Sequence, residues 1–380
     1  MSCDLEQRKI VDEAQAFVNQ EIRPYVKCFE ENKGIPRELI GKMAARGYLA
    51  AALPKRYGGL ELDPVYYGLF TEVFGKACTS TRSLITVHTS LMGETLVRFG
   101  TEEQKNKWLP RLAKGEAIGA FGLSEPDIGS DAKNVKTVWH EEDDYYVING
   151  TKKWITFGHL ADLFIIIASN NGRSTAFLVE RTFPGFESKQ IEGMMAARAT
   201  CIAEIYLNNV RVPKENVLGK INLGFEYIVS TALDSGRYSI AWAGVAIAQE
   251  ALEAMVSYSR TRTQFNEKLR SFQLIRGIIG DAVTKTHAAR ALALKAGELR
   301  KQKDPDAVME TTMAKYFASK AAVDVANDAL QVHGGNGFLS EYPVERLYRE
   351  AKVLEIIEGS SQMQQEMISS FGLQRYYKRR

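Results

Sequence analysis

Cysteine is scarce in this sequence: Cys3, Cys28, Cys78 and Cys201 are the only four among 380 residues, and no two of them form a CxxC pair. The five histidines are also isolated from one another. Such scattered thiols and imidazoles indicate neither a disulfide framework nor a zinc site, so we expect no bound metal. A reducing cytoplasm is the compartment that fits these cysteines best.

Long apolar runs and an excess of charge of one sign are missing as well. No stretch approaches the roughly 20 apolar residues of a membrane-spanning helix, and the N-terminus lacks the apolar core of a signal peptide. The formal net charge is only +3, with Lys and Arg scattered along the chain. We therefore expect neither a membrane nor nucleic acid as a partner. The overall composition is ordinary for a soluble globular enzyme.

The length of 380 residues suggests two or three domains. Residues 1–118 are predicted to form a helical domain, because apolar residues such as Val11, Ala14, Val18 and Ile22 recur at steps of three and four.

Residues 119–225 are predicted to form a compact β domain. Asn149-Gly150 and Asn171-Gly172 each separate β-rich runs, and Asn-Gly is a strong hairpin signal because both residues tolerate positive φ.

In residues 226–380, apolar residues again recur at steps of three and four, as in a helix, for example at Ala241, Val245, Ala248, Leu252 and Met255. Segments 273–300, 305–332 and 344–370 predict three more helices, so a four-helix bundle is the simplest packing. The predicted fold is mainly α with a central β domain.

Glu358 is the strongest catalytic candidate. It follows Ile356 and Ile357, and an apolar environment removes hydration and raises the pKa of a carboxyl group. Gly359 lets the backbone pass close to a flat ligand. From this segment alone, a partly exposed glutamate that begins the next helix is an equally good interpretation.

Other segments support the catalytic interpretation. They are Phe121–Asp131, Lys153–Gly158, Arg262–Phe265, and Gln331–Phe338 with Glu341–Pro343. In this order and at these separations, and together with the Glu358 segment, they resemble the acyl-CoA dehydrogenase family of flavoproteins. The resemblance extends from Pro54–Gly59 to the final motif.

The resemblance implies a helical N-terminal domain, a β-barrel-like middle domain and a C-terminal four-helix bundle, with the flavin between the last two. Glu358 would be the base that takes the α-proton of an acyl thioester, while the flavin accepts the β-hydrogen as hydride. In this family the base can instead lie on the helix that opens the bundle. Gly236 stands at that second place, so the alternative is closed.

The cofactor implied by the resemblance is FAD. The residues that match contacts to its ring and ribityl chain are Phe121, Leu123, Ser124, Trp154, Ile155 and Thr156, and the set is completed by Ser360 and Gln362. The residues that match contacts to the pyrophosphate and adenosine of a flavin in a neighbouring subunit are Arg262, Gln264, Phe265, Gln331 and Gly335. A site shared between chains implies a homodimer or homotetramer, and an electron-transfer flavoprotein is the expected electron acceptor.

Ser130, Asp234 and Arg237 match positions that contact the pantetheine arm of the substrate, which an acyl carrier protein or CoA would carry. The segments Leu233–Trp242 and Ala351–Ser361 resemble the branch that oxidises short polar acyl groups on an acyl carrier protein, as in hydroxymalonyl or methoxymalonyl extender-unit biosynthesis. This is our expectation for the substrate. The alternatives are a short-chain acyl-CoA dehydrogenase of catabolism, a flavin oxidase or monooxygenase on the same fold, and a catalytically silent thioester-binding protein.

Overall fold

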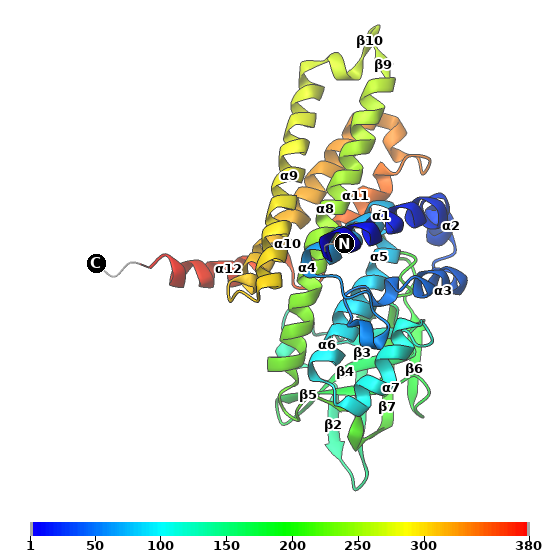
Figure 1. Ribbon diagram of the computed structural model, residues 1–380, viewed down its shortest axis with the longest axis vertical. Helices are drawn as coiled ribbons and strands as arrows, with labels where there is room; N and C mark the ends of the chain where they lie inside the picture. Colours follow the sequence, from blue (N-terminus) through cyan, green and yellow to red (C-terminus); the bar gives the residue numbers. More distant parts are fainter. Residues whose placement is uncertain (1–2, 378–380) are drawn as a thin grey trace. The chain divides into compact units, whose positions relative to one another are not determined.

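The computed structural model describes residues 3–377, which form two compact units (Figure 1). Among the described residues, unit 1 consists of 3–27, Asp63–Arg82 and 237–377, and unit 2 of Cys28–Leu62 and Ser83–Gly236. Residues 1–2 and 378–380, the outer ends of the predicted terminal domains, lie outside the described residues.

Unit 1 is built mainly from helices. They are α1 (Cys3–Phe17), α4 (Pro64–Ala77), the start of α5 (Thr79–Ile85), most of α8 (Ser230–Thr261), α9 (Gln273–Gln302), α10 (Ala307–His333), α11 (Val344–Leu354) and α12 (Ser361–Arg375). Two short strands, β9 (Thr263–Gln264) and β10 (Glu267–Lys268), form a hairpin after α8. Figure 1 shows this hairpin at the far end of the long helices.

Small residues let the bundle helices of unit 1 approach closely. A Cβ added to Gly244 of α8 would lie 2.5 Å from the backbone oxygen of Ala318 of α10. Alanines such as Ala248, Ala322 and Ala326 continue this seam and are fully buried. The residues of the apolar period read from the sequence, Ala241, Val245, Ala248, Leu252 and Met255, are all buried as well.

The prediction of one helix over residues 344–370 was wrong. Helix α11 ends at Leu354 and α12 begins at Ser361. The chain turns between them because Glu358 and Gly359 adopt left-handed backbone conformations, with φ of +55° and +88°, which a right-handed helix cannot contain.

Unit 2 contains a mixed sheet and shorter helices. The helices are most of α2 (Val26–Glu31), α3 (Arg37–Ala45), the π-helical segment Thr86–Glu94, α6 (Thr95–Phe99) and α7 (Glu102–Ala113). The strands are β1 (Gly119–Gly122), β2 (Val138–Glu141), β3 (Tyr145–Ile155), β4 (Leu163–Asn170), β5 (Arg173–Glu180), β6 (Phe186–Gln190), β7 (Ala203–Pro213) and β8 (Val217–Leu218).

Seven of the eight strands follow the order β6-β7-β3-β2-β4-β5-β8, and β1 pairs with β4 in parallel. The predicted hairpin at Asn171-Gly172 is confirmed: it joins β4 to β5, and both residues have positive φ. The one at Asn149-Gly150 was wrong, because β3 runs straight through it. There the register against β7 shifts, so Gly150 forms an irregularity in a paired strand rather than a turn.

A mainly α fold with a central β domain is thus confirmed. The domain boundaries near residues 118 and 225 stay predictions. Among the described residues, no helix combines the length and the apolar character needed to cross a membrane.

Candidate active site

Glu358 lies in the turn between α11 and α12. A left-handed conformation at a glutamate costs roughly 1–3 kcal/mol and persists only where the surrounding structure holds it. Glycine is favoured next, because Gly359 has a φ of +88° and a Cβ there would also lie 2.7 Å from Nε2 of Gln364. Ser360 then caps α12 by accepting a hydrogen bond from the backbone N–H of Met363 at 3.3 Å.

The two carbonyls of the turn accept hydrogen bonds from three helices. The Glu358 carbonyl accepts from Nε of Arg237 on α8 at 3.1 Å and from Nε2 of Gln364 on α12 at 3.2 Å. The Gly359 carbonyl accepts from Nζ of Lys315 on α10 at 2.7 Å and from Nε2 of Gln364 at 3.1 Å. These bonds hold the strained turn in place.

The carboxyl group of Glu358 is desolvated. The residue as a whole is half-buried, but its Oε2 atom is buried and has no hydrogen-bond partner within residues 3–377. Burial raises the pKa of Glu358 to about 7, while the nearby charges of Arg237, Lys315 and Arg82 oppose the rise. A carboxyl group with this pKa can both accept and release a proton near neutral pH.

The expected cause of this raised pKa needs correction. Ile356 is 62% exposed and Ile357 is only half-buried, so the preceding apolar pair does not by itself bury the carboxyl group. Placement of the turn against α8, α10 and α12 is what sequence reasoning missed.

Two further cations near Glu358 were also missed. Lys315 is fully buried, and burial lowers its pKa to about 8. Arg82 is buried as well, with its pKa lowered to about 10 by burial, and it donates to the backbone oxygen of Ser239 at 3.1 Å. The signal for Lys315 was available in the sequence, because it lies on the same face of α10 as the buried residues Thr311 and Ala318.

In unit 2, two segments predicted to hold the flavin lie side by side. Phe121 belongs to β1, and Leu123 and Ser124 follow it directly. The backbone N–H of Lys153 donates to the Ser124 carbonyl at 2.9 Å, which places this segment beside the end of β3.

The end of β3 carries Trp154, Ile155 and Thr156. Trp154 has a φ of +64° and its side chain is 51% exposed, whereas Ile155 is buried and Thr156 half-buried. An exposed indole on strained backbone offers a flat apolar surface, which fits contact with a flavin ring.

A buried ion pair, absent from the predicted site residues, supports this region. Nζ of Lys152 lies 2.7 Å from the Glu125 carboxylate and donates to the Leu123 carbonyl at 3.1 Å. The same carboxylate accepts from the backbone N–H of Lys136 at 2.6 Å and of Thr137 at 2.9 Å. These contacts fix the loop that contains Ser124.

The residues expected to contact a neighbouring subunit's flavin lie away from Glu358. Arg262, Gln264 and Phe265 are exposed at the β9–β10 hairpin, with Phe265 89% exposed. Gln331 and Gly335 are exposed at the end of α10, which reaches the same end of unit 1, because Tyr258 and His333 stack with ring centroids 4.2 Å apart. Arg262 is 25 residues beyond Arg237 along α8, or roughly 37 Å at 1.5 Å per residue. Within one chain, these five residues are therefore not brought together with Glu358.

The remaining predicted residues take varied positions. Asp234 and Arg237 are one turn apart on α8 and both half-buried, while Ser130 is exposed in a loop of unit 2. Ser360 caps α12, and Gln362 is exposed on its first turn.

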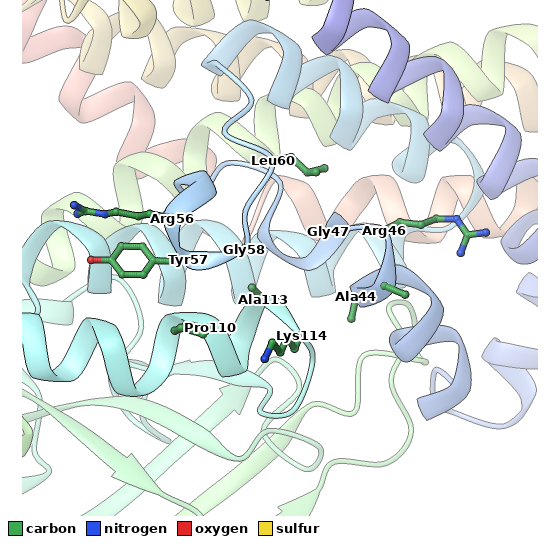
Figure 2. Close-up of a pocket in the computed structure, with 11 residues that line it drawn as sticks. Ala44, Arg46, Gly47, Arg56, Tyr57, Gly58, Leu60, Pro110, Ala113 and Lys114 are labelled. Carbon is green, nitrogen blue, oxygen red and sulfur yellow. The ribbon is translucent and has the colours of Figure 1, made fainter.

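A separate cavity of about 570 Å³ lies in unit 2, among residues of α3, the Lys55–Tyr57 segment and α7 (Figure 2). It contains none of the predicted site residues. Arg46, Arg56 and Lys114 line it, and Figure 2 shows the side chains of the two arginines pointing away from each other.

Family models match almost the whole chain. They are the N-terminal domain of acyl-CoA dehydrogenase over residues 4–116, the middle domain over 120–210 and the C-terminal domain over 222–373. A probable acyl-CoA dehydrogenase of Bacillus subtilis is 39% identical, over 96% of this chain and 97% of that protein. A short-chain specific acyl-CoA dehydrogenase of Clostridium acetobutylicum is 37% identical over the same shares.

Solved structures agree with these relatives. The butyryl-CoA dehydrogenase of Megasphaera elsdenii is 33% identical, with a TM-score of 0.93 over 97% of this chain and 98% of that chain. A protein for biosynthesis of a polyketide's methoxymalonyl extender unit is 30% identical, with a TM-score of 0.86 over 96% of this chain and 99% of that chain. The similarity is thus greater to the acyl-CoA dehydrogenases than to the extender-unit protein.

Proposed function

We propose, from the premise that this chain belongs to the acyl-CoA dehydrogenase family, that it oxidises a short-chain acyl-CoA at the bond between Cα and Cβ, with Glu358 as the base. Membership makes the chain an FAD-dependent oxidoreductase. The observation that best supports the role of Glu358 is its buried Oε2 atom, which has no partner within residues 3–377 and is free to receive a substrate proton.

The reaction removes a proton from Cα and a hydride from Cβ, and leaves a double bond between them. The carboxylate of Glu358 takes the proton, which its pKa of about 7 permits at neutral pH. Bound FAD supplies the acceptor for the hydride. The charges of Arg237 and Lys315 keep part of the Glu358 population ionised and therefore able to act as a base.

Two groups of residues would hold the FAD. In unit 2, Phe121–Ser124 would contact the ring and ribityl chain together with Trp154–Thr156. At the far end of α8, Arg262–Phe265, with Gln331 and Gly335, would contact the dinucleotide of another copy. The exposure of these residues supports a homodimer or homotetramer. We also propose an electron-transfer flavoprotein as the electron acceptor and, from the scattered cysteines, a cytoplasmic location.

The acyl carrier was expected to be a carrier protein, and the comparisons favour CoA instead. Relatives named for short-chain acyl-CoA cover nearly the whole chain at higher identity than the extender-unit protein. We therefore propose short-chain acyl-CoA thioesters as substrates, with carrier-protein thioesters as the competing class.

Anaerobic bleaching of the flavin by a thioester panel tests this choice. The panel holds butyryl-CoA, 2,3-dihydroxypropionyl-CoA, which is short and polar and has hydrogens on both Cα and Cβ, and the same two acyl groups on an acyl carrier protein. We expect butyryl-CoA to give the highest ratio of limiting reduction rate to apparent Kd. A preference of tenfold or more for either carrier-protein thioester would replace the proposed substrate, and a hydroxylated product in a parallel assay with oxygen would indicate a monooxygenase.

A further inference from the structure

We propose that Lys315 is a positioning residue for the base: its buried ammonium group fixes the turn that aims the carboxylate of Glu358. This inference rests on the proposed role of Glu358, and it adds a residue from α10 that contacts the turn.

The burial and the hydrogen bond of Lys315 support its role in holding the turn. Its side chain is fully buried, and Nζ donates to the Gly359 carbonyl at 2.7 Å. Around it on α10, Thr311, Ala314 and Ala318 are all buried. Burying an ammonium group is costly, and a well-packed apolar side chain often stabilises such a site as well or better. Stability alone therefore does not account for a lysine at this position.

The turn that Lys315 holds is strained at Glu358, the proposed base. Glu358 keeps a φ of +55° only while its neighbours hold the backbone. Without Lys315, the described partners of the Gly359 carbonyl reduce to Gln364. The turn can then relax, and a displacement of about 1 Å at a reacting group can cost about 100-fold in rate.

Lys315 also acts through its charge. The charged groups that face it are Glu358 and Glu355 in the turn and Arg237 on α8, and Glu358 is in addition influenced by Arg82 on α5. The positive charge of Lys315 opposes the rise in the pKa of Glu358 that burial causes. Removal of that charge should therefore raise this pKa further, by roughly one unit.

Three variants separate the two effects. Lys315→Met keeps the length of the side chain but removes both the charge and the donor. Gln364→Leu removes the other described donor to the Gly359 carbonyl without changing any charge. Lys320→Met removes an exposed lysine from the same helix and serves as the control.

The measurement is the limiting rate of anaerobic flavin reduction by butyryl-CoA from pH 5.5 to 9, on FAD-loaded protein. For Lys315→Met we expect a 10- to 100-fold lower rate and an apparent thioester Kd within about threefold of wild type. The acid limb of the profile of rate against pH should lie about one pH unit higher. Gln364→Leu should slow flavin reduction without moving the acid limb of the pH profile. Lys320→Met should match wild type in both rate and pH profile.

A rate within twofold of wild type for Lys315→Met, or a slower rate with an unmoved acid limb, would overturn the proposal. If Lys315→Met does not fold, Gln364→Leu decides the positioning role, since a normal rate there contradicts it. Glu358→Gln measured in parallel separates the two claims. If that variant is inactive while Lys315→Met is normal, only this inference fails; if it is active, the proposed function fails first.

Discussion

Glu358→Gln should stabilise the protein at alkaline pH. The folded-state pKa of Glu358 is about 7, raised from the usual 4.5 by burial. The folded protein therefore holds the Glu358 proton more tightly than the unfolded chain does. This contribution to the free energy of unfolding is fully present below pH 4.5 and is lost as the pH rises through 7. The shift of about 2.5 units corresponds to about 3 kcal/mol above pH 8. Glutamine keeps the shape and avoids this loss.

The effect should therefore be large at pH 8.5 and below about 1 kcal/mol at pH 5. With an unfolding entropy of about 2.1 cal/mol/K per residue, a chain of this length should gain about 4 °C in Tm at pH 8.5. Differential scanning calorimetry of the FAD-free protein at the two pH values is the assay. Glu366→Gln, an exposed position on α12, is the matched control. Equal Tm values for Glu358→Gln and wild type at pH 8.5 would refute the reasoning, because they would mean that the carboxyl group is not desolvated.

Two other substitutions test the supports of the site. Gly359→Ala should lower Tm and slow flavin reduction at least tenfold, because a Cβ is strained at a φ of +88° and would lie 2.7 Å from a buried side chain; Gly372→Ala, on open helix surface, should do neither. Lys152→Met should cost roughly 3–5 kcal/mol and weaken FAD retention, because it leaves the buried Glu125 carboxylate without its cation. Lys214→Met removes an exposed lysine that pairs with Glu141 and lies over the Tyr146 ring, and it should cost under about 1 kcal/mol in urea unfolding; equal losses for the two lysine variants would contradict the special role of the buried pair.

The sequence predicted correctly those elements whose formation depends on a few neighbouring residues. The period of α8 and the Asn171-Gly172 turn are both found, because amphipathic spacing and tolerance of positive φ act over a few residues. Asn149-Gly150 carries the same turn signal, but pairing of β3 with β7 on both sides of it overrides the signal. Tertiary context decides such cases.

The candidate site follows the same rule. The raised pKa of Glu358 was expected from its apolar neighbours, but Ile356 is too exposed to be the cause. Arg82, Arg237 and Lys315 lie 276, 121 and 43 positions earlier in the sequence, so no local pattern joins them to the base. Only the packing of α5, α8 and α10 around the turn brings these charges near the carboxylate.

The rate of anaerobic flavin reduction by butyryl-CoA, compared between wild type and Glu358→Gln by stopped flow, tests the central claim most directly. With a pKa of about 7, roughly one tenth of Glu358 is ionised at pH 6 and nine tenths at pH 8, so the wild-type rate should rise about tenfold between them. Glu358→Gln should bind FAD and the thioester but reduce the flavin about 10²- to 10⁴-fold more slowly. Near-normal reduction by Glu358→Gln would contradict the account and exclude Glu358 as the base.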